Sequence, residues 1–114
     1  MCSKDTLHQM LNEAVQELKN MFGKHLNSVY LYGSYARGDA REDSDIDIFV
    51  LVDMPEEQLR SYREKLVALS VALDNKYDVF TSIHEKDLTT FERYKNVLPF
   101  YANIMREGID LIAS

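Results

Sequence analysis

Residues 29–52 hold two apolar runs on either side of a glycine-serine turn, and this arrangement restricts the fold more than any other feature of the sequence. Residues 29–32 form a short run with β-branched and aromatic members, which predicts a strand that ends at Gly33. Ser34 then opens a tight turn, and Gly38 is placed to end the short helix that can follow it. The turn therefore lies at the end of one strand and beside the start of the next.

The turn after Gly33 is suited to an anion, and a phosphate is the anion that we expect there. If a helix starts here, its first backbone N–H groups and the positive end of its dipole face outward together. A glycine lets the backbone approach the anion closely, because a side chain at Gly33 would occupy that space. Ser34 adds a hydroxyl donor, and the guanidinium of Arg37 can lie over phosphate oxygens. For the Gly-Ser pair alone, an ordinary strand-to-helix turn remains the alternative.

The second strand carries two carboxylates on one face. Side chains alternate along a strand, so Asp45 and Asp47 share one face and lie roughly 6–7 Å apart along the chain. Their oxygen atoms are the ligands that hard cations such as Mg²⁺ prefer. A solvated strand face is the alternative for such a pair. The opposite face is apolar and is expected to be core; it consists of Ile46, Ile48, Val50 and Val52.

The remaining elements follow from the spacing of apolar residues. In chain order the sequence predicts a helix over 6–22, a helix from Pro55 to 74–75, a strand over 77–83, helices near 85–95 and 99–107, and a strand over 109–112. Gly108 is expected to cap the last helix. The alternation of helices and strands predicts an α/β (α+β) fold in which helices flank a small mixed sheet of three to four strands.

Composition and charge limit the class of protein. With 114 residues and no linker or repeat, the chain is expected to be a single domain over 1–114. No signal peptide or membrane-length apolar run occurs, which predicts a cytoplasmic protein without a membrane partner. The net charge of −6 argues against nucleic acid as the main partner but is compatible with MgATP. His8, His25 and His84 lie far apart and are expected on the surface rather than in a zinc site.

The turn and the second strand together resemble the DNA polymerase beta-like nucleotidyltransferase superfamily, and most closely its minimal nucleotidyltransferases. The resemblance extends to residues 104–109, which look like the final helix and strand of that family. It implies the palm-like fold of the nucleotidyltransferases. The positions that carry it are Gly33, Ser34, Ala36, Arg37, Gly38, Ser44, Asp45 and Asp47.

The resemblance also implies roles for particular residues. A third carboxylate of the family lies on the strand after the long helix, and Asp78 is the only acid within the strand predicted there. A solvated residue at the strand start is the alternative for Asp78. The implied metal ligands and catalytic residues, which would hold two Mg²⁺ ions, are Asp45, Asp47 and Asp78. The implied ligands of the phosphates of a nucleoside triphosphate, by default ATP, are Gly33, Ser34, Arg37 and Ser44.

The acceptor is open. Minimal nucleotidyltransferases are commonly encoded beside a HEPN-domain protein, and the resemblance implies a toxin–antitoxin pair in which the smaller protein adenylylates or simply binds the toxin. Protein adenylylation is the leading hypothesis. A small-molecule acceptor of the aminoglycoside type and a non-catalytic binding module are the alternatives. Larger family members have a further domain that helps to form the acceptor pocket. Here the second wall of that pocket would come from a homodimer mate, from another protein or from the acceptor itself.

Overall fold

The computed structural model describes residues 3–41 and 43–112. The elements in chain order are α1 (Lys4–Phe22), the 3-10 helix η1 (Gly23–His25), β1 (Leu26–Tyr32), α2 (Ser34–Arg37), β2 (Ile46–Val52), α3 (Glu56–Arg60), α4 (Arg63–Tyr77), β3 (Thr81–Asp87), α5 (Leu88–Tyr94), α6 (Pro99–Glu107) and β4 (Ile109–Asp110). No helix within the described ranges is long and apolar enough to cross a membrane.

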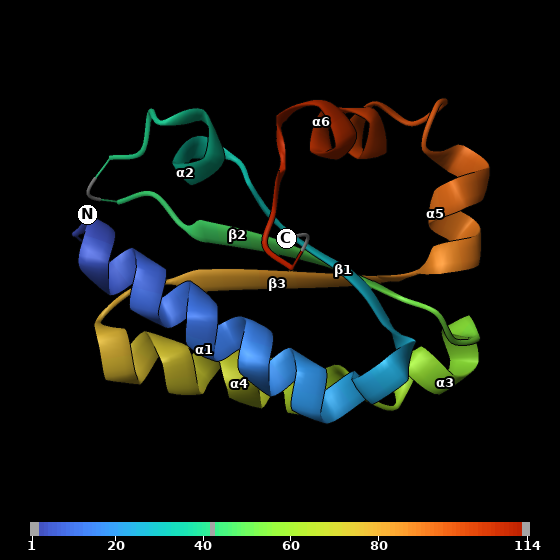
Figure 1. Ribbon diagram of the computed structural model, residues 1–114, viewed down its shortest axis with the longest axis horizontal. Helices are drawn as coiled ribbons and strands as arrows, with labels where there is room; N and C mark the ends of the chain where they lie inside the picture. Colours follow the sequence, from blue (N-terminus) through green and yellow to red (C-terminus); the bar gives the residue numbers. More distant parts are fainter. Residues whose placement is uncertain (1–2, 42, 113–114) are drawn as a thin grey trace.

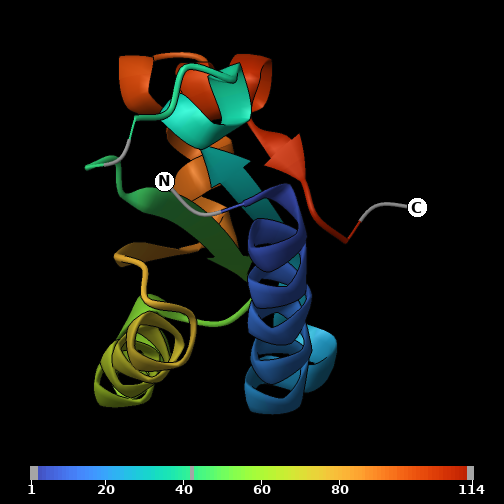
Figure 2. The ribbon, with the colours of Figure 1, turned by 90° about the vertical axis from the view of Figure 1, so that its left-hand side faces the viewer.

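The strands form a four-stranded sheet in the order β3-β2-β1-β4. β1 is antiparallel to both β2 and β4, whereas β2 and β3 run parallel, so the sheet is mixed. Helices α1 and α4 cover one face of the sheet, and α6 lies over the other together with the short α2 (Figure 1). The side view shows α1 and α4 next to each other beneath the sheet (Figure 2). The predicted mixed sheet flanked by helices is confirmed.

The strand β2 separates two apolar clusters because its side chains alternate between the two faces. On the α1 and α4 side, the buried residues of β2 are those predicted to be core: Ile46, Ile48, Val50 and Val52. On the other side, Phe49 and Leu51 pack against Phe91 of α5 and against Tyr101 and Ile104 of α6. Beyond its first two residues, β2 is therefore covered on both faces.

The long helix predicted from Pro55 differs from the observed structure at both ends. It is divided into α3 and α4, and it continues past Asp74 to Tyr77. Asp74 does not end the helix; its Oδ1 instead accepts hydrogen bonds from the backbone N–H and the hydroxyl of Thr81, at 2.8 and 2.9 Å. These bonds attach the first residue of β3 to the last turns of α4. The strand therefore starts at Thr81 rather than at residue 77.

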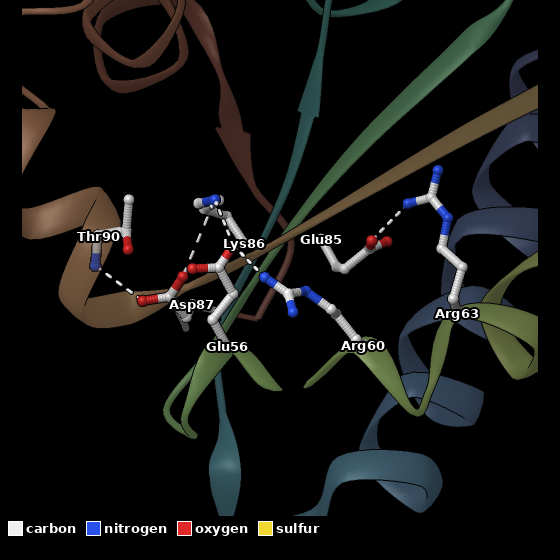
Figure 3. Close-up of polar contacts among 7 residues, drawn as sticks. All are labelled: Glu56, Arg60, Arg63, Glu85, Lys86, Asp87 and Thr90. Carbon is white, nitrogen blue, oxygen red and sulfur yellow. Dashed lines mark hydrogen bonds and ion pairs between the residues drawn. The ribbon is translucent and has the colours of Figure 1, made fainter. Parts of the chain in front are cut away.

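The strand β3 also continues further than predicted, through residues 85–87, which the sequence pattern assigned to a helix. Asp87 is 5 % exposed and accepts a hydrogen bond from the Thr90 N–H at 2.9 Å, which caps α5. Figure 3 shows that the charges beside Asp87 pair with the first residues of two helices, Glu85 with Arg63 of α4 and Lys86 with Glu56 of α3. Because β3 is an edge strand whose charged side chains are paired in this way, it lacks the apolar alternation from which strands are predicted.

Candidate active site

The turn after β1 has the conformation that the sequence predicts. Gly33 adopts φ 75° and ψ −153° and caps the one-turn helix α2, which ends at Gly38 with φ 81°. The backbone N–H groups of Ala36 and Arg37 both donate to the Gly33 carbonyl oxygen at 3.1 Å. The backbone of Gly33 lies in a region that only glycine adopts readily, so this residue is required for the shape of the turn.

The carboxylate of Asp47 lies directly against this turn. In the sheet, Asp47 is paired with Tyr32 of β1 and with Ser82 of β3, and it shares the face that α6 covers. A Cβ atom added to Gly33 would lie 2.4 Å from Asp47 Oδ2, which is closer than Cβ atoms come to other heavy atoms in proteins. Asp45 immediately precedes β2 and is exposed. The structure thus brings the glycine turn and the N-terminal end of β2 together, as the sequence predicts.

The charges around Asp47 favour a cation at this position. Partial burial, and then the negative charge of Asp45, raise the pKa of the Asp47 carboxyl, while His84 and Arg37 act in the opposite direction. Burial and the Asp47 charge likewise raise the pKa of Tyr32 to about 12. A bound divalent cation would relieve the repulsion between the two carboxylates. Asp45 and Asp47 therefore fit a metal ion that substrate phosphates and water also ligate.

Arg37 reaches across from α2 to α6. Its Nε lies 3.4 Å from Asp39 Oδ2, and its Nη1 lies 3.8 Å from Glu107 Oε2. The Arg37 side chain is 46 % exposed, so it remains accessible to an anion at the turn. Surface ion pairs of this kind are worth about 1 kcal/mol or less, and a phosphate can readily replace them.

Ser44 has a local role in the structure. Its hydroxyl accepts a hydrogen bond from the Arg41 N–H at 2.8 Å, and its own N–H donates to the Arg41 carbonyl at 3.0 Å. These bonds close the turn that leads into Asp45. Contact between Ser44 and a phosphate stays a prediction.

The placement of Asp78 within a strand is wrong. Asp78 is the exposed C-cap of α4, with φ and ψ both 54°, and its N–H donates to the Asp74 carbonyl oxygen. It stands three positions before Thr81, where β3 begins. In the part of the chain that the structure describes, no group of three or more His, Cys, Asp or Glu side chains is arranged to hold a metal ion. The role that the family resemblance implies for Asp78 stays a prediction that this geometry does not support.

Mutation can separate the contribution of Asp78 to the reaction from that of Asp45. We expect Asp78→Asn to keep the rate of nucleotidyl transfer within about twofold, as exposed substitutions usually do, because asparagine tolerates the left-handed backbone at this cap. Asp45→Asn is expected to lower the rate far more. Initial rates of pyrophosphate release under identical conditions give the comparison. A loss for Asp78→Asn as large as that for Asp45→Asn would show that the Asp78 carboxylate acts in the reaction.

Several residues beside the site were not found from the sequence. The centroid of the Tyr32 ring lies 6.3 Å from the centroid of the His84 ring and 5.6 Å from that of the Phe100 ring. His84 is exposed, as predicted, but it also lies within the electrostatic range of Asp47. The helical spacing of 99–107 indicates α6 but not which sheet positions it covers. A cavity of about 210 Å³ is lined by Tyr32, Gly33, Arg37, Phe100, Asn103, Ile104 and Glu107.

Comparison with known sequences identifies relatives over most of the chain. The family profile of the nucleotidyltransferase domain matches residues 11–109. The protein adenylyltransferase MntA of Thermococcus cleftensis is 34 % identical over 90 residues, which cover 73 % of this chain and 87 % of that protein. The spectinomycin 9-adenylyltransferase of Staphylococcus aureus is 33 % identical over 101 residues, which cover 86 % of this chain and 38 % of that enzyme.

Solved structures share the fold. One that is provisionally named a minimal nucleotidyltransferase superposes with a TM-score of 0.58 at 32 % identity, over 94 % of both chains. A chain of a toxin–antitoxin crystal structure with AMP-PNP superposes with a TM-score of 0.55, over 90 % of this chain and 73 % of that one. At 21 % identity, this second likeness concerns the fold alone. The chain therefore belongs to the nucleotidyltransferase domain family, as one of its minimal members.

Proposed function

We propose that this chain is a magnesium-dependent nucleotidyltransferase that transfers AMP from ATP to a hydroxyl group. The observation that carries the proposal is the contact between the Gly33 turn and the Asp47 carboxylate, with Asp45 beside it. A phosphate-binding turn in direct contact with a cation-binding pair of carboxylates suits a metal–triphosphate complex, in which phosphate oxygens ligate the metal.

Asp45 and Asp47 would hold Mg²⁺, and we propose two ions. When bound, Mg²⁺ neutralises charge on the triphosphate and lowers the pKa of a coordinated hydroxyl. The raised pKa of Asp47 is consistent with a site that binds its cation together with the substrate. A single Mg²⁺ commonly takes only one or two carboxylates from a protein together with substrate phosphates, so this pair can hold one ion without Asp78.

The residues of the turn would act on the leaving group. The acceptor oxygen attacks the α-phosphorus in line, the bond from that phosphorus to the bridging oxygen breaks, and pyrophosphate leaves while the acceptor proton passes to water. Ser34 and the backbone N–H groups of the turn would hold the oxygens of the leaving pyrophosphate. Arg37 would leave its ion pairs with Asp39 and Glu107 and bind these phosphate oxygens instead. A guanidinium forms stronger, bidentate hydrogen bonds with a phosphate than the long surface ion pairs that it makes here.

We propose a protein acceptor, namely a HEPN-domain toxin that this chain neutralises in the cytoplasm. Support comes from MntA of Thermococcus cleftensis, which is named a protein adenylyltransferase and matches this chain over most of both lengths. The fold is that of a chain in solved toxin–antitoxin structures, one of which contains AMP-PNP. A small-molecule acceptor is the alternative, since the chain also matches part of the spectinomycin enzyme, over 38 % of that enzyme.

The test is transfer of label from ATP carrying a radioactive α-phosphate. Purified protein, Mg²⁺ and labelled ATP are incubated with the HEPN-domain protein of the same host, and in parallel with spectinomycin. We expect label on the HEPN protein with the wild type and with the exposed control Asp43→Asn, but not with Asp47→Asn. Label on the antibiotic alone would favour the small-molecule alternative. Neutralisation of the toxin without label on either acceptor would favour a non-catalytic antitoxin.

A further inference from the structure

The cavity between α6 and the end of β1 continues directly from the phosphate turn. It is lined by Tyr32, Gly33, Arg37, Phe100, Asn103, Ile104 and Glu107, and Gly33 and Arg37 also belong to the turn. Its volume of about 210 Å³ is below the roughly 300 Å³ at which pockets for whole small ligands begin. The cavity therefore suits one part of a nucleotide whose phosphates lie at the turn.

Phe100 offers an aromatic ring at this cavity. The ring packs edge-to-face against Tyr32 and Phe49, whose ring centroids lie 5.6 and 5.8 Å away at interplanar angles of 85° and 81°. Despite these contacts Phe100 remains 44 % exposed. An aromatic side chain that is fixed in orientation and open to solvent is the usual platform on which nucleic-acid bases stack.

Asn103 lies one turn further along α6 and supplies a hydrogen-bonding group to the same cavity. Its Oδ1 accepts a hydrogen bond from Arg106 Nη2 at 2.6 Å. With the carbonyl end engaged, the amide N–H₂ group of Asn103 is the end that can donate to a ligand. Ring nitrogens of a purine are acceptors for such a donor.

We propose that this cavity binds the purine base of the donor nucleotide, with Phe100 stacked on the base and Asn103 donating to one of its ring nitrogens. The inference rests on the proposed function, because the phosphates must lie at the Gly33 turn for the base to reach α6. Phe100 and Asn103 are then the residues that distinguish a nucleoside triphosphate from a bare polyphosphate.

The test compares two ligands that share phosphates but differ in the base. Dissociation constants are measured calorimetrically for AMP-PNP and for inorganic tripolyphosphate, each with Mg²⁺, on wild type, Phe100→Ala, Phe100→Tyr and Asn103→Ala. Met105→Ala is the matched control, since Met105 is 51 % exposed on the same helix and does not line the cavity. Circular dichroism spectra establish that each variant is folded.

For Phe100→Ala we expect a weakening of AMP-PNP binding by roughly 5- to 150-fold, the range for loss of one stacked base, with unchanged binding of tripolyphosphate. Phe100→Tyr and Met105→Ala should bind AMP-PNP as the wild type does, and Asn103→Ala should bind it more weakly.

Two outcomes would overturn the inference. If Phe100→Ala and Asn103→Ala bind AMP-PNP as tightly as wild type, or lose both ligands equally, the base does not lie in this cavity. Such variants with normal AMP-PNP binding but a raised KM for the acceptor would assign the cavity to the acceptor instead. If wild type binds neither ligand, the proposed function itself fails, and the two failures are thereby distinguished.

Discussion

Replacement of Asp47 by asparagine is expected to lower the rate of nucleotidyl transfer by about 10²–10⁴-fold. A metal ion contributes several kcal/mol to stabilising charge in a transition state, and loss of one of two carboxylate ligands removes much of that. Asparagine preserves the shape of the side chain next to Gly33, so the fold of the turn should persist. Single-turnover transfer of labelled AMP, at saturating Mg²⁺ and ATP, measures the effect on the chemical step.

The same substitution is expected to stabilise the fold near pH 7. The pKa of Asp47 is raised in the folded protein above its ordinary value of 3.8, so the ionised carboxylate disfavours the folded state. Protonation of Asp47 therefore stabilises the folded protein. This stabilisation is fully present below the pKa of Asp47 in the unfolded chain, and it is lost as the pH rises through the pKa of Asp47 in the folded protein. Thermal unfolding should therefore give Asp47→Asn a higher Tm than wild type at pH 7, with the difference shrinking toward pH 4.

Two measurements separate this explanation from a general effect of charge. Asp43→Asn removes a carboxylate from the exposed loop before Asp45 and should change neither the transfer rate nor the pH dependence of Tm. Mg²⁺ should raise the Tm of wild type and have little effect on Asp47→Asn, because ligand binding stabilises only a folded state that contains the site. Full activity in Asp47→Asn would exclude the metal site proposed here.

Gly33→Ala is expected to impair both folding and activity. The backbone of Gly33 lies at φ 75°, which costs a residue with a Cβ about 1–3 kcal/mol, and the new methyl group would lie 2.4 Å from Asp47 Oδ2. The carboxylate must then move away from the turn. Displacement of a catalytic group by about 1 Å can cost about 10²-fold in rate, and we expect a loss of this order. Denaturant unfolding and single-turnover transfer measure the two effects.

Gly38→Ala is the matched control for the backbone. Gly38 also has a positive φ, of 81°, but a Cβ added there meets nothing within 4 Å. It should lose about 1–2 kcal/mol of stability and keep its transfer rate. In the double variant Gly33→Ala with Asp47→Ala, the clash is relieved, so the double variant should be more stable than the sum of the two single effects predicts. Additive effects would mean that the contact between Gly33 and Asp47 is unimportant.

The elements that the sequence predicted well are those whose signals are local. Pro99–Glu107 is a helix as predicted, because proline at its start and Gly108 at its end mark the boundaries. The fixed order of Gly33, Ser34 and Gly38 similarly forces a one-turn helix after β1. Asp47 is partly buried because it shares its face with Phe49 and Leu51, which the alternation of the strand already implies.

The placement of Asp78 within a strand was wrong because the ends of α4 and β3 depend on contacts between distant residues. The hydrogen bonds of Asp74 to Thr81 and the ion pair of Glu85 with Arg63 fix where the helix ends and the strand runs. A charged edge strand such as β3 owes its extended form to its pairing with β2, and no local pattern records that pairing.

The sequence by itself determined the turn and the carboxylate pair, because φ preferences and strand alternation act over a few residues. Only the tertiary structure decided that Gly33 touches Asp47 and that Phe100 and Asn103 of α6 lie beside them. That arrangement depends on the packing of Tyr101 and Ile104 against Phe49. Apolar side chains can pack in many registers, and the choice among them is made by shape complementarity across the whole core.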